Sequence, residues 1–517
     1  MISLPSLITR AARLNPEGTA TAYHGRRFTW TEVHERVAAL AGGLASLGLA
    51  EGDRIGILSL NSDRYYESLF AIPWAGYCVV PLNTRWALLE NDYAIRDSGT
   101  RVLLFDDVFS EQARQLLNDV DALTVGIYMG DGQCPAWARP YEELLTSHDR
   151  IAVSERGGDD MAGIFYTGGT TGFPKGVMQS HQAIWASAVG ALPAFSMNRD
   201  DIYLHVAPMF HMADFAGGMA ATLCAGSNVI LPSFDPEQVL ATISTEQVTH
   251  LLLVPAMIKM VLNHPHAASS DVSSLKVMLY GASPMPVATL EQCISLWPNV
   301  GLVQAYGQTE LAPIATTLTA ADHRTGGPIL RSAGRPTPIN DIRIVDQDGN
   351  DCPPGMSGEV VVRGPHTMLG YWNKPEETAR ALRDGWVHTG DVAFIDEQGY
   401  VFIVDRIKDM IVTGGENVFT PEVENAVIRH QAVQDVAVIG IPHDEWGEAV
   451  HAVVILHPGE SVNEEALLDH CRELIAGYKL PKSFTFRAEP LPLSGAGKVL
   501  KTELRKPFWE DSDRQVN

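Results

Sequence analysis

The sequence predicts an α/β protein with more than one domain, and three features of the chain support this. Its 517 residues exceed the size of a single ordinary hydrophobic core. Short apolar strands alternate with amphipathic helices as far as Ala305, which is typical of βαβ units and a largely parallel sheet. The pattern changes to hairpins from Gly334 and to a compact α+β segment beyond Gly415. We therefore expect two α/β lobes in one large domain, followed by a smaller C-terminal domain.

The first elements are a helix within residues 1–30 and a hairpin. Its strands are predicted at Ala20–Tyr23 and Arg27–Thr29, around His24-Gly25. The residues Thr29-Trp-Thr-Glu32 form a capping box, which predicts that a second helix begins there. The apolar residues of that helix fall on one face: Val33, Val37, Leu40, Leu44 and Leu47.

The alternating segments give the predicted elements of the two lobes. The predicted strands are Arg54–Leu60, Cys78–Leu82, Val102–Phe105, Met161–Phe165, Ile202–Val206, Val229–Leu231, Thr249–Val254, Lys276–Tyr280 and Leu302–Ala305. The predicted helices between the first of them are Arg64–Trp74 and Leu88–Asp97.

The last third of the chain is expected to be built differently. Antiparallel strands are predicted at Asp341–Asp346, Gly358–Arg363, Asp391–Ile395 and Tyr400–Asp405. Beyond them we expect helices Pro421–Ile428 and Asn463–Ile475, and strands Asp435–Ile441 and Ala449–Leu456. A charged run, Asp405–Asp409, separates the region of antiparallel strands from the α+β segment. We place the domains at residues 1–404 and 410–517, joined by 405–409.

Composition excludes several classes of function. A net charge of −24 and a pI near 5.1 argue against a nucleic-acid partner. The six cysteines contain no C-x-x-C pair, so neither a disulfide framework nor a zinc site is indicated. The N-terminus lacks the pattern of a signal peptide, and no apolar run is long enough for a transmembrane segment. The cytoplasm is the expected location.

The stretch Tyr166–Val177 is rich in glycine and threonine and predicts a polyphosphate-binding loop. Backbone N–H groups can converge on an anion where no Cβ blocks their approach, and Lys175 adds a positive charge. Ser180 is a good N-cap for a helix from His181, whose N-terminus would favour negative charge. The usual P-loop pattern is excluded, because Pro174 precedes the lysine. The loop residues concerned are Thr167, Gly168, Gly169, Thr170, Thr171, Gly172 and Lys175.

Two predicted strands end in residues suited to a nucleotide, at the edge where open α/β sheets bind ligands. Tyr306 can lie against a purine, Thr309 can donate to phosphate, and Glu310 can hold Mg²⁺. The alternatives are a helix start with a surface glutamate and a purely structural bend. The remaining candidates are small or polar neighbours on these two strand ends: Gly281, Ala282, Ser283, Ala305, Gly307 and Gln308.

Three later residues are also candidates. Asp391 could bind a ribose diol, although a turn residue is the alternative; Arg406 is a fork-shaped donor for ribose or phosphate oxygens. Lys498 stands in a glycine-rich loop, where a solvated lysine is the alternative.

The order of these motifs resembles that of the adenylate-forming superfamily, which includes acyl-CoA synthetases, non-ribosomal adenylation domains and firefly-type luciferases. The resemblance spans roughly Thr21 to Arg505. One departure is Gly168, which stands where that family commonly has serine. The resemblance favours the acyl-CoA synthetase or fatty-acid–CoA ligase type.

The resemblance implies a large N-terminal domain with a distorted β-barrel, and a small mobile C-terminal domain that turns about Lys408. It implies ATP and Mg²⁺, with Thr170 and Glu310 on the metal. Asp391 would hold the ribose, with Ile403 and Arg406 nearby. The residues expected to act in catalysis are Lys175, Thr170, Glu310 and Lys498, the last bridging carboxylate and α-phosphate in the first step only.

Coenzyme A is the implied acceptor of the acyl group. Gly414 and Gly415 resemble the glycines beside the pantetheine tunnel, and Tyr478-Lys479 is placed at the nucleotide end. The alternatives are a ligase that loads a separate carrier protein and a non-catalytic nucleotide-binding homologue. A homodimer is left open.

The acid is expected to be a hydrophobic carboxylic acid, with a medium- or long-chain fatty acid favoured over an aryl acid. His211 resembles the family's residue beside the substrate carbonyl, and the small and apolar residues from Met212 to Ala225 suit a neutral tail. Two rival interpretations are a metal site of His205, His211 and Asp214, and an ammonium partner in Asp214.

Overall fold

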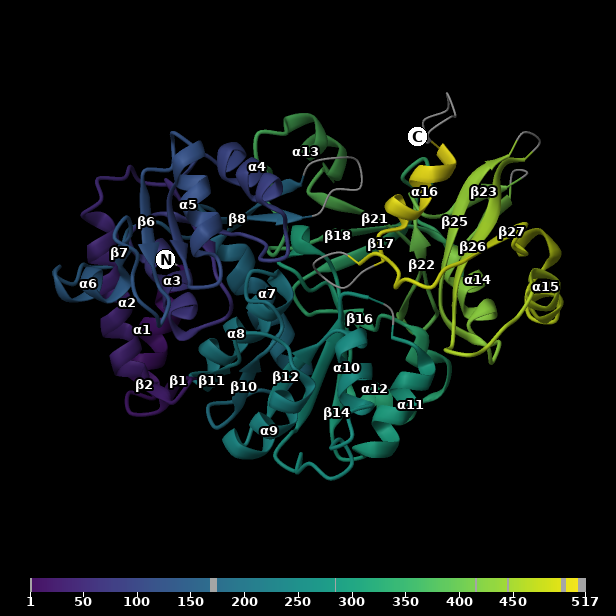
Figure 1. Cartoon of the computed structure of the whole chain (residues 1–517), viewed down its shortest axis with the longest axis horizontal. Coiled ribbons are helices and arrows are strands. Elements are labelled where there is room, and N and C mark those ends of the chain that lie inside the picture. Colours follow the sequence, from purple (N-terminus) through teal and green to yellow (C-terminus); the bar gives the residue numbers. More distant parts are fainter. Residues whose placement is uncertain are drawn as a thin grey trace. The chain divides into compact units, whose positions relative to one another are not determined.

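The computed structural model describes residues 2–167, 174–283, 285–413, 416–443, 446–493 and 499–509. The chain divides into two compact units (Figure 1). The first unit consists of Met1–Ile342 and Val362–His388, and the second of Arg343–Val361 and Thr389–Asn517. The hinge predicted at 405–409 falls within the second unit and stays a prediction, because it concerns a motion.

The helices and strands have the following bounds. The helices are α1 (Leu4–Leu14), α2 (Trp30–Ala45), α3 (Asp63–Trp74), α4 (Leu88–Ser98), α5 (Ser110–Asp119), α6 (Tyr141–Thr146), α7 (His181–Phe195), α8 (Met212–Cys224), α9 (Pro236–Glu246), α10 (Pro255–Leu262), α11 (Val287–Leu296), α12 (Ala320–Thr325), α13 (Pro375–Ala381), α14 (Thr420–Val427), α15 (Glu464–Arg472) and α16 (Lys501–Trp509). The strands are β1 (Thr19–Tyr23), β2 (Arg26–Thr29), β3 (Arg54–Leu58), β4 (Cys78–Pro81), β5 (Thr100–Phe105), β6 (Val125–Tyr128), β7 (Arg139–Pro140), β8 (Met161–Thr167), β9 (Lys175–Ser180), β10 (Ile202–His205), β11 (Ser227–Ile230), β12 (His250–Leu253), β13 (Val277–Gly281), β14 (Gly301–Tyr306), β15 (Thr316–Leu318), β16 (Arg335–Pro336), β17 (Asp341–Val345), β18 (Gly358–Arg363), β19 (Gly370–Tyr371), β20 (Leu382–Arg383), β21 (Trp386–Ile395), β22 (Val401–Arg406), β23 (Ile411–Thr413), β24 (Glu416–Val418), β25 (Val433–His443), β26 (Gly447–Leu456) and β27 (Ser483–Phe486).

Two large sheets form the first unit, and both are mainly parallel, as predicted. One has the order β19-β9-β8-β4-β3-β5-β6-β7 and is parallel from β8 to β7. The other has the order β16-β15-β14-β13-β12-β10-β11-β1-β2 and is parallel from β14 to β1. The antiparallel strands lie at the edges, where they need no crossover connection.

Local sequence explains how several of these elements begin. The capping box of α2 is confirmed, because Thr29 accepts from the amide of Glu32 while its own amide donates to the Glu32 carboxylate at 2.7 Å. The β1–β2 hairpin is confirmed, and β1 pairs with β11, which follows it by about 200 residues. Helices α7 and α8 are mostly buried and pack against each other between the two sheets of this unit (Figure 1).

The second unit is a smaller α+β body. Strands β25 and β26 pair antiparallel over their whole lengths, and β27 joins β26 in parallel. Helices α14 and α15 cover this sheet through a core that includes Val438, Val450 and Leu467 (Figure 1). The predicted pairing of β21 with β22 is confirmed as antiparallel. Within the described residues, none of the helices is both apolar enough and long enough to cross a membrane.

Candidate active site

The predicted phosphate loop connects two antiparallel strands. Strands β8 and β9 form a hairpin in which Thr167 pairs with Lys175. The intervening candidates Gly168, Gly169, Thr170, Thr171 and Gly172 lie outside the described residues.

One expectation about this loop is wrong. Ser180 does cap α7, since its hydroxyl accepts from the amide of Ala183. However, residues 175–180 form a strand, and Ser180 pairs with Met161 at the opposite end of the hairpin. At about 3.4 Å per residue, that strand carries the helix N-terminus roughly 17 Å from Lys175. The helix therefore cannot help to bind an anion at the loop.

Glu310 is held by a tyrosine that the sequence did not indicate. The hydroxyl of Tyr371 on β19 donates to Glu310 Oε1 at 2.8 Å. The Nζ atom of Lys175 lies 5.2 Å from the centre of the same tyrosine ring. Tyr371 therefore connects the predicted metal ligand with the predicted phosphate-binding lysine. A tyrosine that follows a glycine gives no chemical signal in a sequence, which is why it was missed.

The backbone around Glu310 is fixed as well. Gln179, at the end of β9, donates from Nε2 to the carbonyl of Thr309 at 2.5 Å. The amide of Met368 donates to the carbonyl of Glu310 at 2.9 Å. Gln179 is fully buried, so this turn is anchored to the sheet that carries the phosphate-loop hairpin.

The predicted adenine-binding segments lie side by side at one sheet edge. Strands β13 and β14 are parallel neighbours, and Gly281 pairs with Ala305. A Cβ atom on Gly281 would overlap the carbonyl oxygen of Ala305, so only glycine fits there. Ala282 has a φ of 65°, which turns the chain away directly after the strand. The structure thus gathers the remaining candidates of both strand ends: Ser283, Tyr306, Gly307, Gln308 and Thr309.

Asp391 and Arg406 are direct neighbours in the second unit. They pair across β21 and β22, and Arg406 Nε lies 3.1 Å from Asp391 Oδ1. Ile403 lies on β22 with Arg406. The pair combines a carboxylate acceptor and a guanidinium donor, the two groups expected for a ribose.

Hydrogen bonds hold the chain on both sides of Lys408, the predicted hinge residue. Before it, the amide of Ile407 donates to the carbonyl of Gly390 at 2.9 Å. After it, Arg505 on α16 donates to the carbonyls of Lys408 and Asp409 at 2.8 and 3.2 Å. Burial lowers the pKa of Lys408 to about 8. The other candidates of this unit, Gly414, Gly415 and Lys498, lie outside the described residues.

Aromatic and cationic side chains occur together elsewhere in the second unit. The ring of His443 stacks on Trp446 at 4.2 Å, and Lys482 Nζ lies 5.0 Å from the centre of the Trp446 ring. Tyr478 is 43% exposed. Lys479 donates to both carboxylate oxygens of Glu422, so a phosphate could use it only by displacing that carboxylate.

The rival metal site is wrong. His211 is the N-cap of α8, and its Nδ1 accepts from the amide of Ala213 at 3.2 Å. His205 instead bonds to Asp214 at 2.6 Å and to Asn228 at 3.0 Å. Among the described residues, no group of three or more His, Cys, Asp or Glu side chains is placed to hold a metal.

The small residues of α8 have a packing role, which corrects a second expectation. A Cβ atom on Gly217 would overlap the Tyr203 ring, and one on Gly218 would overlap the His205 ring. Asp214 is fully buried between the same two side chains, so it is not available to a substrate ammonium. The small residues of α8 therefore do not indicate which carboxylic acid is the substrate.

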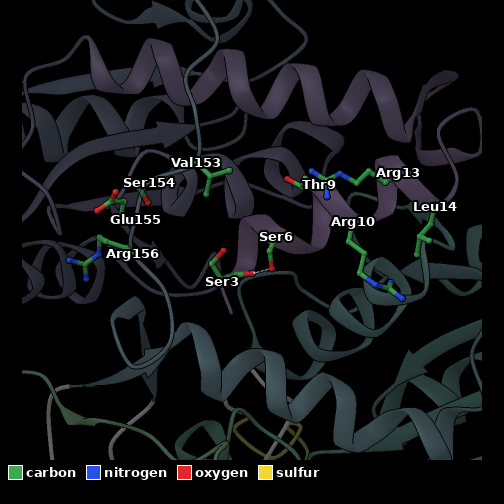
Figure 2. A pocket seen from close by; sticks show the side chains of 10 residues that line it. All are labelled: Ser3, Ser6, Thr9, Arg10, Arg13, Leu14, Val153, Ser154, Glu155 and Arg156. Atoms are coloured by element: carbon green, nitrogen blue, oxygen red, sulfur yellow. Dashed lines mark hydrogen bonds between the residues drawn. The ribbon is translucent and has the colours of Figure 1, made fainter. Parts of the chain in front are cut away.

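One cavity of the first unit lies away from these residues. It has a volume of about 740 Å³ and is lined by the exposed face of α1 and by residues 153–156 (Figure 2). Among the described residues, none of the predicted site residues lines it.

Comparison with known proteins agrees with the sequence motifs. Residues 8–372 match the model of the AMP-binding enzyme family, and residues 422–498 match that of the AMP-binding enzyme C-terminal domain. The chain belongs to the AMP-binding enzyme family. It is an adenylate-forming enzyme of the acyl-CoA synthetase type, an AMP-forming acid–thiol ligase.

Individual relatives match over nearly the whole chain. A feruloyl-CoA synthase from an Amycolatopsis species is 40% identical over 506 residues, which cover 98% of this chain and 99% of that protein. A medium/long-chain fatty acid–CoA ligase from Mycobacterium tuberculosis is 35% identical over 95% of this chain and 87% of that protein. The structure of o-succinylbenzoate-CoA synthetase from Bacillus subtilis with its acyl-adenylate intermediate has a TM-score of 0.85 at 28% identity, covering 99% of both chains. The predicted fold class is thereby confirmed.

Proposed function

We propose that this enzyme joins a neutral, hydrophobic monocarboxylic acid to coenzyme A, with aryl-propenoic acids of the ferulate kind as the first substrate class. The structural observation that supports an adenylating site is the connection of Lys175 to Glu310 through Tyr371, beside the phosphate-loop hairpin. The feruloyl-CoA synthase relative supports the choice of acid, since it is 40% identical over 98% of the chain.

The chemistry takes two steps, because a carboxylate is a poor electrophile that a thiol does not attack. In the first step a carboxylate oxygen attacks the α-phosphorus of ATP, and pyrophosphate leaves. The product is an acyl-adenylate, in which AMP is a good leaving group. In the second step the thiol sulfur of coenzyme A attacks the acyl carbon, the thiol proton is lost, and AMP leaves.

Five of the candidate residues receive the following roles in this scheme. Lys175 binds the β- and γ-phosphates, Tyr306 packs on adenine, and Asp391 with Arg406 binds the ribose. Lys498 stabilises the negative charge that develops on the α-phosphoryl oxygens. A cation placed there can raise the rate of the step by about 10²–10³.

Mg²⁺ would be held by Glu310, together with Thr170. A carboxylate offers the hard oxygen ligand that this ion prefers, and Glu310 Oε1 already has its orienting donor in Tyr371. When bound, the ion would neutralise negative charge on the phosphates of ATP.

Coenzyme A would bring its adenine to Trp446. An indole ring with Lys482 beside it combines a stacking surface and a phosphate-binding charge. The two steps need different groups around one carbonyl, which gives a physical reason for a turn of the C-terminal domain about Lys408. Residues 373–421, between the two matched family ranges, include this segment.

Medium- and long-chain fatty acids are the second candidate class. They are favoured by the fatty acid–CoA ligase relative, which is 35% identical over 95% of the chain.

A pyrophosphate-release screen over aryl, fatty and amino acids, run with ATP and magnesium, tests the proposal. We expect release with ferulate-type acids, and acyl-CoA with AMP when coenzyme A is added. Accumulation of acyl-AMP despite coenzyme A would indicate a carrier-protein acceptor instead. A chain that binds ATP but releases no pyrophosphate with any acid would be a non-catalytic homologue.

A further inference from the structure

We propose that Tyr371 is a positioning residue for adenylation: its hydroxyl orients the Glu310 carboxylate toward a divalent cation, and its ring supports the Lys175 ammonium. The inference rests on the proposed function, because it takes Glu310 as the cation ligand.

The carboxylate of Glu310 is constrained at one oxygen. Its Oε1 accepts from Tyr371 at 2.8 Å, and among the described residues no donor is bonded to Oε2. The side chain is only 9% exposed, so it cannot freely sample other orientations. With the backbone of Thr309 and Glu310 also pinned by Gln179 and Met368, Oε2 is left as the oxygen for a cation.

Tyr371 is itself fixed relative to Lys175. It pairs with Val177 on β9, two residues after the lysine, and its amide donates to Thr378 Oγ1 at 2.9 Å. Its ring and hydroxyl therefore reach two different charged groups from one rigid position. The Lys175 ammonium lies over the ring face, where a cation–π attraction stabilises it.

Removing the hydroxyl alone separates the two roles. In Tyr371→Phe the ring stays over Lys175 while Glu310 loses its donor. We expect Mn²⁺ binding to the ATP-bound protein, titrated by electron paramagnetic resonance, to weaken by about tenfold, which is the scale of one hydrogen bond to a charged group. Binding of ATP without metal, measured by calorimetry, should not change.

A second variant tests the ring. Tyr371→Leu should weaken metal-free ATP binding as well, because Lys175 loses its aromatic support. Thermal melting shows whether each variant is folded. If Tyr371→Leu does not fold, Tyr371→Phe alone tests the proposal.

The matched control is Tyr141→Phe. The hydroxyl of Tyr141 on α6 also donates to a glutamate, Glu67, at 2.8 Å within the same unit, but neither residue belongs to the proposed site. This variant should leave Mn²⁺ and ATP binding unchanged.

Unchanged Mn²⁺ affinity in Tyr371→Phe, or an equal loss in Tyr141→Phe, would overturn the inference. If the unaltered protein binds ATP but no Mn²⁺, the proposed cation site is itself wrong and the inference falls with it. Unchanged Mn²⁺ affinity in Tyr371→Phe, or an equal loss in Tyr141→Phe, would leave the proposed ligase function intact. The failure of the inference and the failure of the proposed cation site are therefore distinguishable.

Discussion

The Tyr371 hydroxyl donates a hydrogen bond to Glu310 Oε1, and the two oxygens are 2.8 Å apart. The two residues are separated by 61 positions in the sequence. The contact joins the turn after β14 to the short edge strand β19, which belongs to the other sheet of the first unit. Lys175, at the end of the phosphate-loop hairpin, lies over the same ring. The proposed metal and phosphate sites are therefore parts of one rigid arrangement.

Lys498 should be needed in only one half-reaction. Lys498→Ala is expected to lower acid-dependent pyrophosphate release by about 10²–10³, because the developing phosphoryl charge loses its cation. The same variant should convert supplied acyl-AMP and coenzyme A to acyl-CoA at the unaltered rate. Lys506→Ala, at an exposed lysine of α16, is the control. Equal losses in both half-reactions would contradict the assigned role.

Gly281 should tolerate no side chain. In Gly281→Ala the new methyl group overlaps the carbonyl oxygen of Ala305, and forced overpacking of this kind costs about 1–3 kcal/mol. We expect a lower melting temperature and weaker ATP binding, measured by calorimetry. Gly477→Ala, where a Cβ atom meets no neighbour, should change neither. ATP binding of normal strength in Gly281→Ala would remove these strand ends from the nucleotide site.

Trp446 should affect the second step only. Trp446→Ala removes a stacking surface worth about 1–3 kcal/mol for one base, so KM for coenzyme A should rise about tenfold. Pyrophosphate release without coenzyme A should not change. Phe486→Ala alters an exposed aromatic ring elsewhere in the second unit and serves as the control. A normal KM in Trp446→Ala would place the adenine of coenzyme A elsewhere.

Asp405 should make stability depend on pH. It is buried and accepts from the amide of Thr420 at 2.6 Å, and burial raises the pKa of Asp405 to about 6 from 3.8. The native state thus holds the proton more tightly than the unfolded chain. The stabilisation from this group is complete below about pH 3.8 and is lost as the pH rises through about 6.

The comparison of the unaltered protein with Asp405→Asn isolates this effect. Between about pH 5.5 and 8 the stability of the unaltered protein, relative to the variant, should fall by about 1 kcal/mol. Melting temperatures at both pH values measure it. A difference that stays constant or grows with pH would show that Asp405 ionises normally.

Sequence predicts best where a pattern is local. The capping box of α2, the β1–β2 hairpin and the parallel strands follow from short-range periodicity, and the structure confirms them. The neighbours Gly281 and Ala305 could also be anticipated, because the ends of parallel strands meet at one edge.

Features that depend on distant partners could not be predicted. Ser180 is a good N-cap wherever it stands, so it could not show that β9 separates the helix from the loop. The small residues of α8 look like a pocket lining until Tyr203 and His205 of β10 are placed against them. Tyr371 becomes informative only when β19 pairs with β9.

The central claim is that the acid is activated by bonding to AMP, and isotope transfer tests it most directly. The enzyme is incubated with ATP, Mg²⁺, coenzyme A and an acid labelled with ¹⁸O in its carboxylate, and the products are analysed by mass spectrometry. We predict one ¹⁸O atom in the phosphate of AMP, because a carboxylate oxygen attacks the α-phosphorus and stays with it when the thiol displaces AMP. Recovery of the label in inorganic phosphate, with ADP as the nucleotide product, would contradict the claim.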